Sequence, residues 1–563
     1  MSTKPLLSRK ERPWWRDAVT YQIYIRSFAD SNGDGKGDVN GIRNRLPYLK
    51  ELGVDALWIT PWYPSPQIDH GYDVADYLDI EPEYGTLAQA EELIKEVHEN
   101  GMKILVDIVP NHSSDKHLWF QEALKSAPGS KARERYMFRD GKGKNGELPP
   151  NNWQAVFGGP AWERIREADG ALGQWYLHLF AVEQPDFNWE NEEVRGYFEE
   201  VLKFWLDRGV DGFRIDVAHG MIKAPGLPDV VAPDPKAEML APENRPFWDQ
   251  DGVHDIYRKW RKILDSYPGD RMAVAEAWVS PASRIARYLR PDELANSFNF
   301  DFLSSPWEPT TLKQMIDRSI AALSEVGAPS SWVLNNHDVV RSVDRFDLGL
   351  IPGKAKTTLE RHGDGDKFDI VRGTERARAG ALLMLALPGG AYVYQGEELA
   401  LPEARDIPED RLTDPRWALS KQTDRGRDGC RVPLPWKSNT AGAFGFSSEN
   451  SLTPSQAWLP QSAEWGAFSV ESQDRDPNST LNLYRQALAI RGGDEALGDG
   501  TIEWLNAGNS VLAFKRSANF ACYVNFGAAI NIPDGSVVLI ASSPLKGAMI
   551  PTDTAVWVRI SAV

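Results

Sequence analysis

The segment VDGFRIDVAHG, residues 210–220, places charged side chains inside what otherwise resembles a buried strand. Its apolar residues favour an extended conformation, in which residues i and i+2 share one face. Arg214 and Asp216 therefore point to one side of the strand, whereas Phe213 and Ile215 point to the other. Because burying an unpaired charge costs free energy, an arginine and a carboxylate on one face of a buried strand indicate a functional position.

Seven similar runs of β-branched or aromatic residues occur along the chain, and helical patterns such as LAQAEELIKEVHENG separate them. Helices of this kind, ending at a glycine, are typical of the crossovers between parallel strands. Strand alternating with helix eight times predicts an α/β fold with a (β/α)8 TIM barrel. A doubly wound sheet is the alternative, but no glycine-rich dinucleotide fingerprint follows the first strand. The eight expected strands span residues 18–28, 54–62, 102–112, 210–217, 272–279, 298–302, 330–338 and 391–398.

Two departures from this alternation predict additional domains. Residues 113–177, after the third strand, are rich in Gly, Asn, Pro and Lys, and we expect them to form an inserted lobe, domain B, over one end of the barrel. Beyond residue 476 the chain has short alternating runs separated by turn residues, which predicts a C-terminal antiparallel β-sandwich domain at 476–563. The barrel itself is then expected at 1–112 and 178–475.

The composition narrows the range of partners. The 563 residues carry a formal net charge of −17, which opposes binding to nucleic acid or to an anionic membrane. No run of about 18 apolar residues occurs, as a membrane span requires, and the N-terminus lacks a signal-peptide pattern. Cys430 and Cys522 are too few for a disulfide framework or a metal cluster. We expect a cytoplasmic protein, monomeric or homodimeric, that binds a small neutral molecule and neither nucleic acid nor membrane.

Acidic residues close several of the expected strands. In a TIM barrel the carboxyl ends of the strands form the active site, so these side chains are candidates for catalysis. Asp216, Glu276 and Asp338 end the fourth, fifth and seventh strands and should converge on the barrel mouth. Ordinary ion pairing is the alternative, but three buried carboxylates at equivalent strand ends are uncommon without a role. The acidic residues at or near strand ends are Asp107, Asp216, Glu276, Asp301 and Asp338.

The neighbours of two of these carboxylates predict opposite protonation states. Arg214 should hold Asp216 ionised by lowering its pKa. An apolar setting beside Trp278 should raise the pKa of Glu276, so that this side chain keeps a proton. An ionised and a protonated carboxyl group flanking one bond are what glycoside hydrolysis requires. The residues themselves therefore favour a glycosidase.

Eight motifs support this interpretation by their order and spacing. Four of them are DIVPNH (107–112), GFRIDV (212–217), AEAW (275–278) and NNHD (335–338). The others are DHGYDVADY (69–77), QPDFNW (184–189), YQGEE (394–398) and RDGCRVPLPW (427–436). The first four resemble the signature regions of the α-amylase family, glycoside hydrolase family 13. The second four resemble motifs of its oligo-1,6-glucosidase and α-glucosidase branch, so the similarity spans nearly the whole chain.

The resemblance implies a retaining mechanism with assigned roles. Asp216 matches the nucleophile, Glu276 the acid/base, and Asp338 the third carboxylate, which grips ring hydroxyls and stabilises the transition state. Asp69 and Arg427 match the pair that closes the pocket at the non-reducing end and makes such enzymes exo-acting. The residues matched to substrate binding are Asp69, Tyr72, His112, Phe157, Gln184, Arg214, Val217, His337 and Arg427.

The segment DSNGDGKGD, residues 30–38, places oxygen-bearing side chains at alternate positions. Such hard ligands suit Ca²⁺ or Mg²⁺, although an EF-hand would need glutamate where Gly41 stands. The resemblance implies a structural Ca²⁺ in this loop and no organic cofactor, and a metal-free turn is the alternative. The expected ligands are Asp30, Asn32, Asp34, the main-chain carbonyl of Lys36, and Asp38.

The resulting prediction is an exo-acting α-glucosidase that hydrolyses terminal α-1,4- or α-1,6-linked glucose from short oligosaccharides. Val217 follows the matched nucleophile directly, and valine there accompanies acceptance of α-1,6 bonds in the resembled branch, which favours isomaltose-type substrates. A transglycosylase or isomerase of the same family, of the sucrose isomerase or trehalose synthase type, is the alternative because it shares every catalytic residue. A non-catalytic relative, such as the heavy subunit of an amino-acid transporter, is disfavoured because it lacks the carboxylates and carries a membrane anchor.

Overall fold

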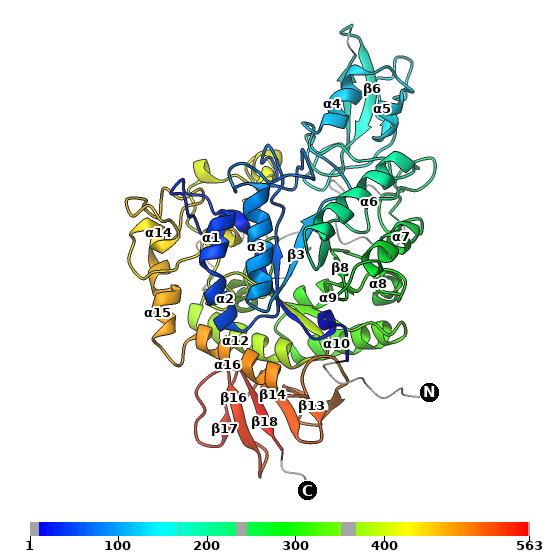
Figure 1. Cartoon of the computed structure of the whole chain (residues 1–563). Coiled ribbons are helices and arrows are strands. Elements are labelled where there is room, and N and C mark those ends of the chain that lie inside the picture. The colour runs from blue at the N-terminus through cyan, green and yellow to red at the C-terminus, as the bar shows by residue number, and fades with distance from the viewer. Residues whose placement is uncertain (1–10, 168, 232–244, 351–367, 561–563) are drawn as a thin grey trace.

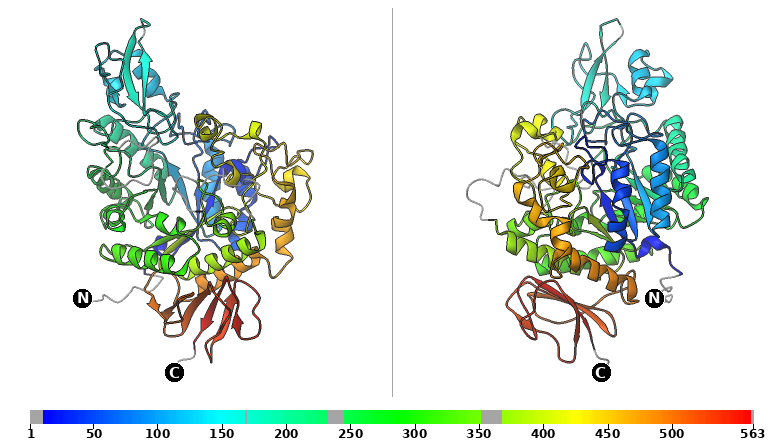
Figure 2. Two further views of the ribbon diagram at one scale, coloured as in Figure 1. Left: turned by 180° about the vertical axis from the view of Figure 1, so that it is seen from behind. Right: turned by 60° about the vertical axis from the view of Figure 1, so that its left-hand side comes forward.

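The chain folds into a barrel with a lobe over one end and an antiparallel sheet against the other (Figure 1). Figure 2 shows the same arrangement from two further sides, with helices wrapped around the barrel strands. The computed structural model describes residues 11–167, 169–231, 245–350 and 368–560.

Eight parallel strands form the barrel sheet, in the order β10-β11-β1-β2-β3-β7-β8-β9. The ladder between β3 and β7 sets Asp107 directly beside Arg214. Nearly every strand residue is buried, as expected for a parallel sheet that is covered on its outer face by helices. The TIM barrel prediction is thus confirmed. The strands are β1 Val19–Ile23, β2 Ala56–Ile59, β3 Lys103–Ile108, β7 Gly212–Ile215, β8 Met272–Ala275, β9 Asn296–Ser297, β10 Ser331–Val333 and β11 Gly390–Tyr394.

The barrel helices begin at recognisable capping residues. Helix α3, Leu87–Glu99, starts with a capping box in which Thr86 and Gln89 exchange hydrogen bonds, and it buries apolar residues three or four positions apart. The side chain of Asn191 caps α6, Glu192–Asp207, by accepting the main-chain N–H of Glu193. The remaining barrel helices are α1 Val39–Asn44, α2 Leu46–Leu52, α6 Glu192–Asp207, α7 Val253–Asp265, α8 Ala282–Tyr288, α10 Pro309–Ser324, α11 Ser342–Leu348 and α12 Ile370–Ala386.

The sixth strand differs from its prediction. Strand β9 is only two residues long, and helix α9, Phe300–Leu303, occupies most of the run expected to be extended. The side chain of Asn299 caps this helix by accepting the main-chain N–H three residues later. A short aromatic run is buried equally well as strand or helix, so its pattern alone did not separate the two. Asp301 consequently lies in the first turn of α9, exposed to solvent, rather than at a strand end.

The inserted lobe contains an antiparallel sheet in the order β4-β6-β5. Its apolar core includes Trp153 and is continuous with Val217 of the barrel. The ammonium group of Lys223 lies 2.8 Å from Asp186 and 2.9 Å from Asn111, and so joins the segment returning from the lobe to the loop after β3. These contacts hold the lobe over the carboxyl ends of the strands. Its elements are α4 Leu118–Lys125, α5 Lys131–Glu134, β4 Phe138–Arg139, β5 Trp162–Arg166 and β6 Leu172–Leu177.

The C-terminal antiparallel sheet is also confirmed, in the order β12-β13-β14-β18-β16. Helix α16, Thr480–Gly493, precedes it, so the residues directly after 476 are helical instead of extended. The indole N–H of Trp557 donates to the carbonyl of Leu382 at 3.0 Å and fastens the sheet to α12. The strands are β12 Glu503–Trp504, β13 Val511–Ser517, β14 Phe520–Asn525, β16 Val537–Ala541 and β18 Thr554–Arg559, with a separate pair β15 Ile530–Asn531 and β17 Met549–Ile550.

Short helices connect the last barrel strand to α16. They are α13 Pro415–Leu419, α14 Gly442–Gly445 and α15 Val470–Asp474. Over the described ranges of the chain, no helix combines the length and the apolar character that a membrane crossing needs.

Candidate active site

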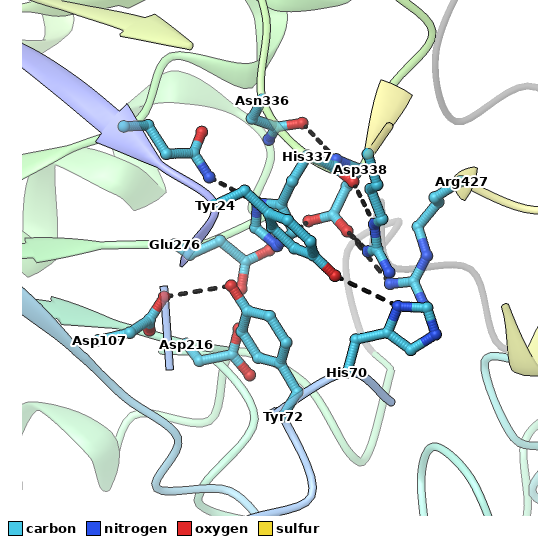
Figure 3. A network of polar contacts seen from close by, with 12 residues as sticks. Tyr24, His70, Tyr72, Asp107, Asp216, Glu276, Asn336, His337, Asp338 and Arg427 are labelled. Atoms are coloured by element: carbon cyan, nitrogen blue, oxygen red, sulfur yellow. Dashed lines mark hydrogen bonds and ion pairs between the residues drawn. The ribbon is translucent and has the colours of Figure 1, made fainter. Parts of the chain in front are cut away.

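Loops at the carboxyl ends of three barrel strands bring Asp216, Glu276 and Asp338 together (Figure 3). The first two residues follow β7 and β8 directly, and Asp338 lies on the loop after β10. Their side chains are 9%, 4% and 25% exposed, respectively. Asp338 is therefore the most accessible of three carboxylates that share one buried site.

Arg214 lies at the centre of the buried carboxylates. Its Nη1 donates to Asp107 at 3.0 Å and also to Asp216, and its Nη2 lies 3.7 Å from Oε2 of Glu276. The guanidinium carbon is 5.2 Å from the ring centre of Trp58, so one side of the cation is covered by an aromatic face. Because one cation compensates three carboxylates, at least one of them favours its protonated form.

The pKa values follow from burial and from this shortage of positive charge. Burial raises the pKa of Glu276 to about 8, and the charge of Asp216 adds to the effect. Burial likewise raises the pKa of Asp107 to about 7. The predicted lowering of the Asp216 pKa is wrong, because burial raises it and the attraction of Arg214 offsets only part of the increase. The proton still belongs on Glu276, since Arg214 binds Asp216 directly and Glu276 only at 3.7 Å.

Two N–H groups hold the carboxyl group of Glu276. The main-chain N–H of Val217 donates to Oε2 at 2.6 Å, and the indole N–H of Trp278 donates to Oε1 at 2.7 Å. Val217 has a φ of 45°, a left-handed conformation that is unfavourable for a β-branched residue. The strained turn directly after Asp216 thus aims a main-chain donor at the neighbouring carboxyl group.

Two arginines bind the third carboxylate. Nη1 of Arg427 lies 3.1 Å and Nη2 of Arg431 lies 2.9 Å from Oδ1 of Asp338. Burial alone would raise the pKa of Asp338, but His337 and the two guanidinium groups hold it well below its ordinary value. Asp338 is therefore ionised over the pH range in which Glu276 titrates. Arg431 belongs to the same matched motif as Arg427, and the two arginines share this carboxylate.

Arg427 closes one side of the site. Its Nη2 forms an ion pair with Asp69 at 2.7 Å, and its guanidinium carbon lies 5.3 Å from the ring centre of Phe157. Asp414 fixes this arginine twice, because its Oδ2 accepts Nε–H at 2.6 Å and the main-chain N–H of Arg427 at 2.8 Å. Sequence reasoning missed Asp414. Its only local signal is an Asp-Pro pair at the start of α13, which indicates an ordinary helix cap.

Stacked rings form another wall of the site (Figure 3). The rings of Tyr72 and His337 lie 5.2 Å apart with an interplanar angle of 9°. The side-chain amide of Gln22 lies 2.6 Å from Nδ1 of His337, and the hydroxyl of Tyr24 lies 3.2 Å from Nδ1 of His70. Gln22, Tyr24 and His70 were not predicted, although the first two belong to the first strand and its end, and His70 stands inside a matched motif.

The side chains of His112 and Gln184 both contact the main-chain carbonyl of Tyr72. Nε2 of His112 is 3.1 Å from the carbonyl oxygen of Tyr72 and 3.1 Å from Nε2 of Gln184. The amide of Gln184 also donates to Asp69 at 3.2 Å. Burial lowers the pKa of His112 and of His337, and both imidazoles form hydrogen bonds within the site.

The acidic loop at 30–38 is organised by its own main chain. The carboxylate of Asp30 accepts three main-chain N–H groups of this loop, and Asp38 caps α1 by accepting the N–H of Gly41. Across the described residues, no group of three or more His, Cys, Asp or Glu side chains could hold a metal ion. The carboxylates of the loop do not converge on one point, and the Ca²⁺ ion stays a prediction.

The site combines four chemical capabilities. It has a carboxylate bound by arginine, Asp216, and a buried carboxyl group that keeps a proton at neutral pH, Glu276. It has a permanently charged carboxylate, Asp338, and flat aromatic walls. A ligand that has a polar ring and a cleavable bond from that ring to a substituent fits these groups. One carboxyl group can attack the ring carbon of that bond while the other donates a proton to the leaving atom.

Comparisons with known proteins agree with the motifs. A family model described as alpha amylase, catalytic domain, matches residues 22–500. The oligo-1,6-glucosidase of Parageobacillus thermoglucosidasius is 37% identical over 525 residues, which cover 88% of this chain and 86% of that protein. The probable alpha-glucosidase of Rhizobium meliloti is 37% identical over 529 residues, with coverages of 92% and 89%. A crystal structure of an alpha-glucosyl transfer enzyme is 32% identical and superposes with a TM-score of 0.81 over 98% of this chain and 100% of its own.

Proposed function

The chain belongs to the alpha-amylase family, glycoside hydrolase family 13, as a glucosidase, and we propose that it is an exo-acting, retaining α-glucosidase of short oligosaccharides. The observation that carries the proposal is the single guanidinium of Arg214 in contact with both Asp216 and Glu276. Retaining glycosidases place their two carboxyl groups about 5–5.5 Å apart, and inverting ones about 6.5–9.5 Å apart. Two carboxyl groups on one guanidinium favour the shorter separation.

The proposed reaction has two steps. A carboxylate oxygen of Asp216 attacks C1 of the terminal glucose while the bond from C1 to the leaving oxygen breaks. Glu276 transfers its proton to that oxygen, so the rest of the substrate leaves as an alcohol. Glu276, now ionised, then takes a proton from water, and the oxygen of that water attacks C1 of the glucosyl ester. Two successive inversions release α-glucose and return Asp216 as a carboxylate.

Ion pairing at one side of the site supports exo action. The bond between Arg427 and Asp69, with Arg427 also bound to Asp338, would fill the space beyond the non-reducing end of a bound glucose. The ionised Asp338 would accept hydrogen bonds from ring hydroxyls, and the stacked Tyr72 and His337 would border the sugar ring. A single terminal glucose is then the largest unit that this end of the site admits.

The position of Val217 supports acceptance of α-1,6 bonds. Its side chain is 2% exposed and packs in the apolar cluster that contains Phe157 and Trp248. Because it follows Asp216 directly, its volume borders the region where the second sugar must lie. Glucosidases of the α-1,6 type are also named among the relatives of this chain.

Transfer of glucose to a sugar instead of water is the second candidate. The superposed alpha-glucosyl transfer enzyme supports it. Both activities form the same glucosyl ester on Asp216, and they differ only in whether water or a sugar hydroxyl gives its proton to Glu276. An isomerase would return the same two sugars in a new linkage.

A substrate panel tests the proposal. The purified protein is incubated with maltose, isomaltose, sucrose, trehalose and p-nitrophenyl α-glucoside, and the products are identified by chromatography and proton NMR. We expect free glucose that is released as the α-anomer and mutarotates afterwards. Initial release of β-glucose would contradict retention. A disaccharide with a new linkage, formed in place of glucose, would favour transfer.

A further inference from the structure

The acid/base carboxyl has two opposite tasks in the proposed reaction. Glu276 must carry a proton in the first step and must lack it in the second. Burial, together with the charges of Asp216 and Asp338, favours the protonated form, and Arg214 opposes them from a distance of 3.7 Å. Formation of the ester on Asp216 removes one of the charges that favour the proton, and N–H donors in contact with the carboxyl group favour its ionised form further.

Trp278 is placed to supply such a contact. It stands two positions after Glu276, on the loop that follows β8. Its indole N–H donates to Oε1 of Glu276 at 2.7 Å, while the main-chain N–H of Val217 donates to Oε2. An N–H donor stabilises a carboxylate more than it stabilises a carboxylic acid.

The indole ring is held in place by its neighbours. Trp278 is 8% exposed and lies parallel to Phe300, with ring centres 3.8 Å apart and an interplanar angle of 12°. Phe300 begins α9, the helix that follows the short sixth strand β9. The N–H is therefore a fixed donor and not one rotamer among several.

We propose that Trp278 is a positioning residue whose indole N–H orients the Glu276 carboxyl group and keeps it able to release its proton for the second step. This inference rests on the proposed two-step reaction. The charged groups that face Glu276 are Arg214 on β7, Asp216 after β7 and Asp338 after β10. Loss of the indole N–H leaves the Val217 amide as the only close donor among the described residues that face this carboxyl.

One substitution removes the N–H and leaves the shape of the ring nearly unchanged. Replacing Trp278 with 3-benzothienylalanine by stop-codon suppression substitutes sulfur for N–H in a ring of the same shape. Trp278→Phe is the accessible companion variant. Phe300→Leu is the matched control, because it disturbs the ring stack while the N–H of Trp278 remains. Melting temperatures of all variants show whether the fold is retained.

Three readouts follow from the lost donor. The alkaline limb of kcat/KM for a disaccharide should move upward by about one pH unit, because one hydrogen bond to a charged group is worth about that much. In the glucosyl enzyme the ionised fraction of Glu276 then falls as well, by at most about tenfold, and kcat for p-nitrophenyl α-glucoside, whose leaving group needs no proton, should fall with it. Azide attacks the glucosyl ester without giving up a proton, so it should restore that kcat and yield glucosyl azide.

The results that would contradict the proposal can be told apart. If the benzothienylalanine enzyme keeps the wild-type alkaline limb and gains nothing from azide, Trp278 does not act through its N–H. If Phe300→Leu produces these changes while the benzothienylalanine enzyme produces none, Trp278 acts by packing alone, which also overturns the proposal. If the wild type cleaves no α-glucoside at all, the proposed function fails and this inference falls with it, so the two failures are told apart by the wild-type assay.

Discussion

Glu276→Gln should remove the proton donor, and the resulting loss of kcat/KM measures how much this donor contributes to catalysis. In the wild type, protonated Glu276 is the active form in the first step, so kcat/KM should fall as pH rises through about 8. General acid catalysis contributes about 10²- to 10⁴-fold, so kcat/KM for isomaltose or maltose should fall by that factor. The alkaline limb near pH 8 should disappear, since an amide does not titrate there.

The structure also predicts a stability cost for the same substitution. Both oxygens of Glu276 accept N–H groups, from Val217 at 2.6 Å and from Trp278 at 2.7 Å. The new NH₂ group must face one of these donors, which leaves buried polar groups unsatisfied at a cost of about 1–3 kcal/mol. The midpoint of urea unfolding should therefore fall while the m-value stays unchanged.

The assay compares substrates that differ in leaving group, over a range of pH. The first step with p-nitrophenyl α-glucoside should be nearly unaffected in Glu276→Gln, because p-nitrophenolate leaves without a proton. Glu293→Gln is the matched control: this carboxylate is equally buried but is paired with His254 and Arg258 outside the site. Disaccharide turnover within tenfold of wild type, with the limb near pH 8 intact, would refute the assignment of Glu276.

Three further outcomes follow from individual contacts. Arg427→Lys cannot reach all three of its carboxylate partners at once, so KM for maltose should rise about 10- to 100-fold, the value of one or two charge-assisted hydrogen bonds, whereas Arg425→Lys should leave KM unchanged. Val217→Thr should lower the ratio of isomaltose to maltose turnover, and an unchanged ratio would show that this side chain does not read the linkage. If the loop around Asp30 binds Ca²⁺, the melting temperature should rise on adding Ca²⁺ and fall with a chelator in the wild type but not in Asp30→Ala. A melting temperature insensitive to both additions would rule the ion out.

The barrel was predictable because its signals are repetitive. Each strand is a short apolar run followed by a helical pattern, and a parallel sheet admits few other arrangements. Only the sixth unit failed, because an asparagine cap turned an aromatic run into α9. That exchange depends on one side-chain hydrogen bond, which an apolar pattern does not record.

The catalytic residues of the site could be predicted from the sequence, but the pKa shifts of their side chains could be predicted only in part. Asp216, Glu276 and Asp338 could be found because strand ends converge in this fold. The direction of the Asp216 pKa could not, because it depends on how completely the side chain is buried and on three carboxylates sharing Arg214.

Some contacts within the site were also beyond the reach of the sequence. Asp414 fixes Arg427 from the loop at α13, and Arg431 binds the same oxygen of Asp338 as Arg427 does. The contact between Arg431 and Asp338 joins segments that are 93 residues apart, and the local pattern around Asp414 indicates only a helix cap. Their partners became visible only once the loops were placed in space.

Covalent attachment of glucose to Asp216 is the step on which the proposed reaction depends. In Glu276→Gln, p-nitrophenyl α-glucoside can still glucosylate the enzyme, but no base remains to hydrolyse the ester, so the intermediate should accumulate. Rapid acid quenching, peptic digestion and mass spectrometry should then find one added glucosyl group on the peptide that contains Asp216. A burst of p-nitrophenol with that peptide unmodified, or with glucose attached to another residue, would contradict the mechanism.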